Sequence, residues 1–212
     1  MLLSTTQLPM FLTATIILLL TPGPAVLYII ARSVDQGRRA GLVSMLGIEA
    51  GNLFHAAGAA LGISAILLSS ALAFDIVKYL GAAYLIYLGI RTLTTPVKAQ
   101  TTDVIEKKSL GQIFSQGMVV AILNPKTALF FFAFLPQFVD RSAGSAPLQL
   151  LTLGLIFVAL AVITDGLYAL AAGTAGRWLR GNLRFLQFQR YFAGTVYIGL
   201  GLAAAFSGAE RK

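Results

Sequence analysis

The sequence predicts an all-α integral membrane protein with about six transmembrane helices, arranged as two three-helix inverted repeats whose first and fourth helices are broken. The composition, the spacing of apolar runs and a proline motif found once in each half support this fold class. Hydrophobic residues make up 57% of the 212 residues, charged residues only 11%, and the mean hydropathy is +0.81. A soluble domain of this length could not bury so much apolar surface.

Apolar runs of about 20 residues predict the spans, because a helix of that length crosses the hydrocarbon core. Six runs meet the condition: roughly 8–31, 42–70, 76–94, 111–139, 148–173 and 190–207. Helices are expected because no run shows the strict alternation of a barrel strand, and lipid offers no partner to an open sheet edge. The first run is too long for a signal peptide and lacks a basic n-region, so we expect it to be kept as a transmembrane helix and not cleaved. A five-span alternative, with the N-terminus inside, remains if 42–94 is miscounted.

Basic residues set the expected orientation in a bacterial cytoplasmic (inner) membrane, since Lys and Arg gather in cytoplasmic loops. The first, third and fifth loops carry most of them: Arg32, Arg38, Arg39, Arg91, Lys98, Lys107, Lys108, Arg177, Arg180, Arg184 and Arg190. The opposite side has Lys78, Arg141, Arg211 and Lys212. Both termini are therefore predicted to lie outside.

Composition excludes several functions. The net charge of +8 comes in short clusters between apolar runs, so nucleic-acid binding is not expected. The chain has no cysteine and one histidine, which argues against thiol redox chemistry and metal export, and no cofactor or metal site is expected. The expected partners are the lipid bilayer, protons and a small-molecule substrate.

The two halves of the chain resemble each other. "FLTATIILLLTPGP" begins at Phe11 and "FSQGMVVAILNPK" at Phe114, so that Pro22 and Pro125 occupy corresponding positions. "KYLGAAYLIYLGI" (78–90) likewise matches "RYFAGTVYIGLGL" (190–202). The predicted units are a three-helix repeat at 1–94, a cytoplasmic linker at 95–110 and a second three-helix repeat at 111–212. An odd number of spans per unit requires opposite insertion of the two units.

The prolines predict interrupted helices. Proline has no N–H, so Pro22 frees the carbonyl of Leu18, Pro24 that of Leu20, and Pro125 that of Ala121. Thr21 and Asn124 are expected to cap the half-helices that follow. Interrupted backbone at membrane depth lines cavities and attracts anionic groups, although prolines also simply kink packed helices. The predicted substrate-binding residues are Thr21, Pro22, Gly23, Pro24, Asn52, Asn124, Pro125 and Lys126.

Ionisable residues inside the spans predict proton coupling. Lys126 is expected to approach Glu49 or Asp165, because a lysine at that depth needs a partner or a function. Asp165 is the stronger coupling candidate, since its apolar flanks (AVITDGLYAL) favour the uncharged carboxyl; Glu49 lies nearer the predicted end of a span. Glu49, Asn52 and His55 form a stripe on one helix face. His55 is expected either to take part in coupling or to be a packing histidine.

Glycines at two four-residue spacings in the second span predict close helix packing, either within one subunit or between two, so a homo-oligomer is left open. These glycines are Gly47, Gly51, Gly58 and Gly62.

Five motifs together resemble the LysE/RhtB superfamily of amino-acid exporters over nearly the whole chain. They are "TPGP" (21–24), "LGIEAGNLFHAAGAALGISAIL" (46–67), "YLGAAYLIYLG" (79–89), "NPKTALFFFAFLPQF" (124–138) and "GTVYIGLGLAAA" (194–205). The resemblance implies export of amino acids such as homoserine, threonine, leucine or lysine from the bacterial cytoplasm, driven by the proton gradient. Glu49 stands where such proteins are expected to have a small or neutral residue.

We therefore predict a secondary active exporter of small amino acids, working by proton antiport and alternating access. A passive amino-acid or small-solute channel is the alternative. An intramembrane enzyme with His55 and Ser64, Ser69 or Ser70 is disfavoured, because on one continuous helix His55 and Ser69 lie about 21 Å apart.

Overall fold

The computed structural model describes residues 7–63, 71–95, 108–140, 144–181 and 183–206, and every element within these ranges is helical. The chain begins with α1 (Gln7–Leu20), α2 (Pro24–Gln36) and α3 (Arg38–Gly58), which continues into the π-helical segment η1 (Ala59–Ile63). Next come α5 (Ala71–Thr94), α6 (Leu110–Ile122) and α7 (Pro125–Leu129), which continues through the π-helical η2 (Phe130–Phe134) and the 3₁₀ segment η3 (Leu135–Phe138). The two last helices are α8 (Ala146–Gly181) and α9 (Leu183–Phe206). The all-α prediction is confirmed for these ranges.

Both predicted breaks are present, and they are alike. The axes of α1 and α2 differ by 47°, and so do those of α6 and the α7–η3 segment. Pro24 and Pro125 are the first residues of α2 and α7, where proline has no hydrogen bond to lose. The sequence thus located both interruptions.

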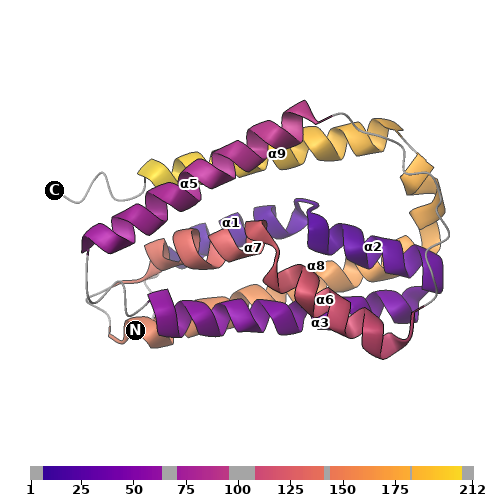
Figure 1. Ribbon diagram of the computed structural model, residues 1–212, viewed down its shortest axis with the longest axis horizontal. Coiled ribbons are helices and arrows are strands. Elements are labelled where there is room, and N and C mark those ends of the chain that lie inside the picture. The colour runs from indigo at the N-terminus through magenta and orange to yellow at the C-terminus, as the bar shows by residue number, and fades with distance from the viewer. Residues whose placement is uncertain (1–6, 64–70, 96–107, 141–143, 182, 207–212) are drawn as a thin grey trace.

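The halves interlock instead of packing side by side. α3 lies against both α6 and α8, whereas α2 lies against α3 and α8. The bent pair α1–α2 of the first half therefore contacts α8 of the second half, and the bent pair α6–α7 of the second half contacts α3 of the first. α5 and α9, the last helices of the two halves, run side by side along one edge of the molecule (Figure 1).

Glycines allow the closest of these contacts. A Cβ on Gly47 of α3 would stand 2.2 Å from the backbone carbonyl oxygen of Phe114 in α6. A Cβ on Gly117 of α6 would stand 2.7 Å from the backbone carbonyl oxygen of Ser44 in α3. Gly51 faces α6 as well, and Gly58 meets Phe132 at ordinary contact distance, while nothing lies within 4 Å of Gly62. The glycines of the second span thus pack mainly within one subunit.

Aromatic rings fill the core between α1, the α7–η3 segment and α8. The rings of Phe130 and Phe157 are tilted and lie 5.0 Å apart between centroids, Phe131 meets the Phe157 ring edge-on at 4.9 Å, and Phe11 contacts Phe138 at 5.5 Å. All are almost fully buried. This packing fixes the position of the chain directly after the second break.

One helix, α8, is apolar enough over Ala146–Thr174 to cross a membrane by itself, and each bent pair qualifies as one further span, so the described residues give up to three. Six spans therefore stay a prediction. The start of α1 and the end of α9 lie toward one end of the molecule, and the ends of α2 and α8 lie at the other (Figure 1).

Some basic residues that were expected in loops lie in helices. Only Gly37, whose φ of 83° suits glycine, separates α2 from α3, so Arg32, Arg38 and Arg39 lie in helices. α8 and α9 likewise extend well past their predicted ends, through Gly181 and from Leu183. Helices carry these basic residues beyond the apolar runs because hydropathy marks the lipid-facing length and not the helix ends. Most of the linker 95–110 lies outside the described residues, as do Ser64, Ser69 and Ser70.

Candidate functional site

The two breaks meet at Lys126. Its ammonium nitrogen donates a hydrogen bond of 2.6 Å to the backbone carbonyl of Thr21, from the interruption between α1 and α2. Asn124 caps α7 by accepting a hydrogen bond of 3.1 Å from the backbone N–H of Lys126, which fixes the start of that helix. Lys126 is only 7% exposed, and Thr21 is fully buried. A buried cation thus lies against the unwound backbone of the other half.

Gly23 leaves room for this lysine. A Cβ at Gly23 would lie 3.2 Å from Lys126 Cδ, 3.3 Å from the Tyr197 hydroxyl oxygen and 3.5 Å from Lys126 Nζ. The glycine therefore sits where an ammonium, a phenol and the first backbone N–H groups of α2 come together. Tyr197, which α9 contributes, is buried.

Two buried carboxyl groups extend this cluster. Asp165 of α8 is near enough to both Lys126 and Glu49 of α3 for direct electrostatic interaction. Both are 4% exposed. Asn52 donates a hydrogen bond of 2.9 Å to Glu49 Oε2. Two acids and one cation therefore lie in one buried cluster.

Long-range side chains satisfy carbonyls that the prolines leave free. The Tyr168 hydroxyl of α8 donates a hydrogen bond of 3.0 Å to the Leu20 carbonyl. His55 Nε2 of α3 lies 3.1 Å from the Ala121 carbonyl, so this nitrogen carries the proton. The Leu18 carbonyl accepts from the Thr21 N–H at 3.0 Å. Each break is therefore held by a helix of the opposite half.

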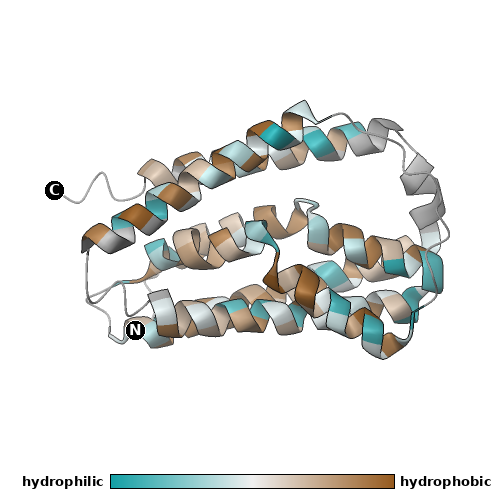
Figure 2. Ribbon diagram, viewed as in Figure 1, coloured by the Kyte–Doolittle hydropathy of each residue, from teal (hydrophilic) through white to brown (hydrophobic). Residues whose placement is uncertain are grey.

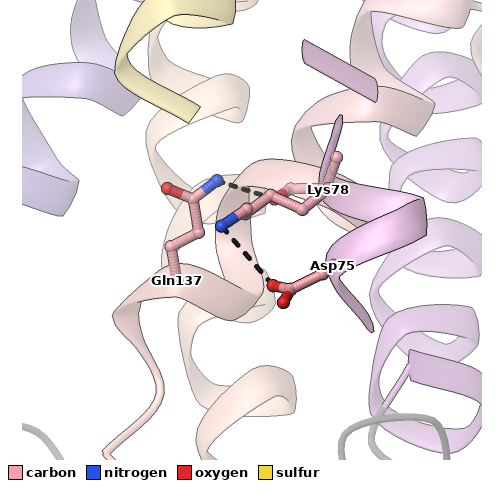
Figure 3. A network of polar contacts seen from close by, with 4 residues as sticks. Asp75, Lys78 and Gln137 are labelled. Carbon is pink, nitrogen blue, oxygen red and sulfur yellow. Dashed lines mark hydrogen bonds and ion pairs between the residues drawn. The ribbon is translucent and has the colours of Figure 1, made fainter. Parts of the chain in front are cut away.

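Another buried lysine shows a different arrangement. Lys78 of α5 is also 7% exposed, but its ammonium lies 3.5 Å from the carboxylate of Asp75, one turn earlier. Figure 3 shows both side chains together with Gln137, which donates a hydrogen bond of 2.9 Å to the Ala133 carbonyl. Among the described residues, Lys126 has no acid within 4.0 Å. Because the Lys126 ammonium is hydrogen-bonded to a neutral carbonyl, its positive charge can still bind an anion.

The LysE type translocator family matches residues 16–208 of the chain. The chain belongs to this family. It is a multi-pass protein of the bacterial cytoplasmic membrane, as the sequence predicted.

Relatives of this translocator have informative names. It is 34% identical over 137 residues to the leucine efflux protein of Salmonella typhimurium, covering 63% of each chain. It is 30% identical to an uncharacterized membrane protein of Vibrio cholerae, covering 92% of this chain and 94% of that one. A Bacillus subtilis uncharacterized membrane protein is 29% identical over 90% of this chain and 94% of its own. No solved structure matches the translocator significantly.

The structure brings most of the predicted site residues of this translocator together. They include Thr21, Gly23, Asn124, Lys126, Asn52, Glu49 and Asp165, all of them buried. Pro22 and Pro125 shape the breaks and are partly exposed, whereas Pro24 is exposed and lies outside the site. Thr21 is not the cap of α2, because its hydroxyl donates back to the Ile17 carbonyl at 2.7 Å and Gly23 takes the cap position.

The structure places two residues of the polar stripe on α3. Glu49 does not lie near a helix end: it is buried in the middle of α3, which begins before the predicted span. Within the described part of the chain, His55 makes no hydrogen bond to either acid; its ring contacts those of Phe131 and Phe132, and Nε2 binds the Ala121 carbonyl.

Sequence reasoning missed the two tyrosines, Tyr168 and Tyr197. Tyr168 follows Asp165 by three residues and so shares its helix face, which was a usable signal. Nothing in the sequence singled out Tyr197.

Proposed function

We propose that this translocator is a secondary active exporter of small neutral amino acids, working as a proton antiporter in which two inverted three-helix repeats alternate access to one central site. The Lys126–Thr21 hydrogen bond supports this proposal most directly, because it puts a buried cation between the two interrupted helices. The name of the leucine efflux relatives supports an aliphatic substrate.

In this proposal, the substrate carboxylate binds Lys126 Nζ, displacing it from the Thr21 carbonyl. The hydroxyl of Tyr197 and the free N–H groups at the start of α2 lie next to the same place, beside Gly23. An ion paired with a buried ammonium makes a strong, charge-assisted hydrogen bond. Gly23 is needed there because a side chain would occupy the space of the carboxylate.

The substrate ammonium binds the Glu49–Asp165 pair. With one shared proton the pair carries a single negative charge, which the charge of Lys126 balances. An arriving ammonium favours full ionisation of the pair, so the proton leaves as the substrate binds. On the acidic outer side, a proton returns to the pair and weakens ammonium binding. One proton is thus exchanged for one amino acid.

Charge matching also sets the substrate class. A zwitterion places its carboxylate on Lys126 and its ammonium on the carboxyl pair, and none of these site residues offers a second cation to an anionic side chain. Acidic amino acids are therefore not expected, and the name of the leucine efflux relatives favours neutral ones.

Uptake by inside-out vesicles tests the proposal. Vesicles with an acidic lumen are expected to accumulate labelled leucine, and Asp165→Asn is expected to abolish accumulation while leaving leucine–leucine counterflow. The matched control is Asp75→Asn, because Asp75 is the exposed partner of Lys78 and should leave coupling unchanged. Accumulation by Asp165→Asn would contradict the coupling role, and non-saturable flux without counterflow would indicate a passive channel.

A further inference from the structure

A second polar cluster joins α2 to the start of α6, at the end of the molecule away from the termini. Gln36 Nε2 donates to the Lys108 carbonyl at 2.8 Å, and the Lys108 N–H donates back to Gln36 Oε1 at 3.0 Å. The Tyr28 hydroxyl donates to the Ile113 carbonyl at 3.0 Å. Figure 2 shows hydrophilic residues gathered at this end, where α2 ends and α6 begins. The positive-inside rule places it in the cytoplasm.

Arg32 lies buried in this cluster without a close partner. It is 6% exposed, yet its contacts are long: Nη1 is 3.4 Å from Gln36 Oε1, and Nη2 is 3.5 Å from Gln116 Oε1. Its Nε has no hydrogen-bond partner within the described residues. The guanidinium also lies over the ring of Tyr28, 5.5 Å from the centroid. Good N–H···O bonds measure about 2.7–3.2 Å, so this buried cation is poorly satisfied.

Gln116 is the shared acceptor of two cations. Lys108 Nζ donates to its Oε1 at 3.0 Å and Arg32 Nη2 at 3.5 Å. The Tyr28 hydroxyl oxygen lies 3.4 Å from the same atom, but its single proton is donated to the Ile113 carbonyl. Both cations thus converge on one neutral atom. Such a set of donors is better matched to an oxyanion.

We infer that Arg32, Lys108 and Tyr28 form a loading site that binds the α-carboxylate of the substrate at the cytoplasmic end, before it reaches Lys126. The inference rests on the proposed export function and names a second substrate site for it. The free Nε and the weakly bonded Nη2 form the edge of the guanidinium that binds a carboxylate through two parallel hydrogen bonds. The nearest acid along α2 is Asp35, which is exposed.

The loading site and the central site are separate. Arg32 lies eight residues after Pro24, the first residue of α2, which places it about 12 Å further along the helix. One carboxylate cannot contact both Arg32 and Lys126. A substrate would therefore pass from the first cation to the second along the inner face between α2 and the α6–α7 pair.

A binding experiment isolates the loading site. The full-length protein carrying Lys126→Met is titrated with L-leucine in nanodiscs of neutral phosphatidylcholine, and L-leucinamide, which lacks the carboxylate, serves as the competitor control. We expect weak leucine binding that leucinamide does not displace, and at least a tenfold loss when Arg32→Gln is added. The matched control is Arg39→Gln, because Arg39 is exposed at the same end and should not change binding.

Transport measured from each face supplies the second readout. With Lys126 intact, Arg32→Gln is expected to raise the KM for leucine at the cytoplasmic face about tenfold, with kcat and the KM at the opposite face within twofold of wild type. Arg32→Lys should recover part of the loss, because it keeps the charge without the bidentate edge.

Several outcomes would overturn the loading site. One is equal leucine binding with and without Arg32→Gln, and another is an equal change of KM at both faces. A lower unfolding temperature with unchanged KM would make the cluster a structural contact between α2 and α6. Displacement of leucine by phosphatidylglycerol in the nanodisc would assign the cluster to a lipid headgroup instead. If wild-type protein transports no amino acid, the proposed function fails; acetate binding that Arg32→Gln removes would still establish the oxyanion site.

Discussion

The ammonium of Lys126 reaches across to the carbonyl of Thr21, 105 residues earlier in the chain, and binds it at 2.6 Å. The contact joins the second interrupted helix to the first. Any movement that separates the two bent pairs must break this hydrogen bond or replace it. A carboxylate is the natural replacement, since it binds an ammonium more strongly than a peptide carbonyl does.

Removing the charge of Lys126 should abolish substrate binding at the central site. We expect Lys126→Met, which keeps most of the side-chain volume, to weaken leucine binding at least a hundredfold, or about 3 kcal/mol, because a charged hydrogen-bond partner is lost. Equilibrium binding to purified protein measures this. The matched control is Lys78→Met, at an equally buried lysine that already has Asp75 as partner, and it should leave binding within threefold. Equal losses in both variants would contradict the assignment.

Glu49 should be needed for coupling. Glu49→Gln retains a side-chain oxygen for the hydrogen bond from Asn52 but cannot share an exchangeable proton with Asp165. We expect proton release on leucine binding to fall from about one per substrate to near zero, as read by a pH dye in weakly buffered detergent solution. Leucine binding should persist within about tenfold. Full proton release by this variant would show that Glu49 is not part of the coupling pair.

The hydroxyl of Tyr168 should stabilise the first break. Tyr168→Phe removes the donor to the Leu20 carbonyl and leaves that carbonyl, already freed by Pro24, without this partner. We expect the free energy of unfolding to fall by about 1 kcal/mol. Thermal unfolding in mild detergent provides the measurement, with Tyr191→Phe on the exposed face of α9 as the control. A Tyr168→Phe protein as stable as this control would mean that the contact contributes little.

The crossing of α3 and α6 should not tolerate a side chain at Gly47. A methyl group there would stand 2.2 Å from the Phe114 carbonyl oxygen, so the helices must separate. We expect Gly47→Ala to lower the free energy of unfolding by about 2 kcal/mol, within the range for overpacked contacts. The control is Gly199→Ala, since nothing lies within 4 Å of that position and alanine favours the helix. Unchanged stability of Gly47→Ala would contradict the close crossing.

The sequence alone determined the helical class and the place of both breaks. A long apolar run favours a helix wherever it lies, and Pro24 and Pro125 remove backbone hydrogen bonds whatever surrounds them. For the same reason the freed carbonyls of Leu20 and Ala121 could be named in advance. Helix ends were less predictable, because α2 and α3 extend through basic residues that hydropathy assigns to loops.

Only the tertiary structure decided which side chains meet at the breaks. Tyr168 reaches Leu20, His55 reaches Ala121 and Lys126 reaches Thr21, each across the interlocked halves of the chain. The pairing of Glu49 with Asp165, and of Arg32 with Gln116, depends in the same way on how α3 packs against α8 and α2 against α6. Local sequence fixes where a backbone group loses its partner, because proline acts on its own turn. The side-chain donors to the carbonyls of Leu20 and Ala121 come from distant helices, and their positions are set by packing between helices.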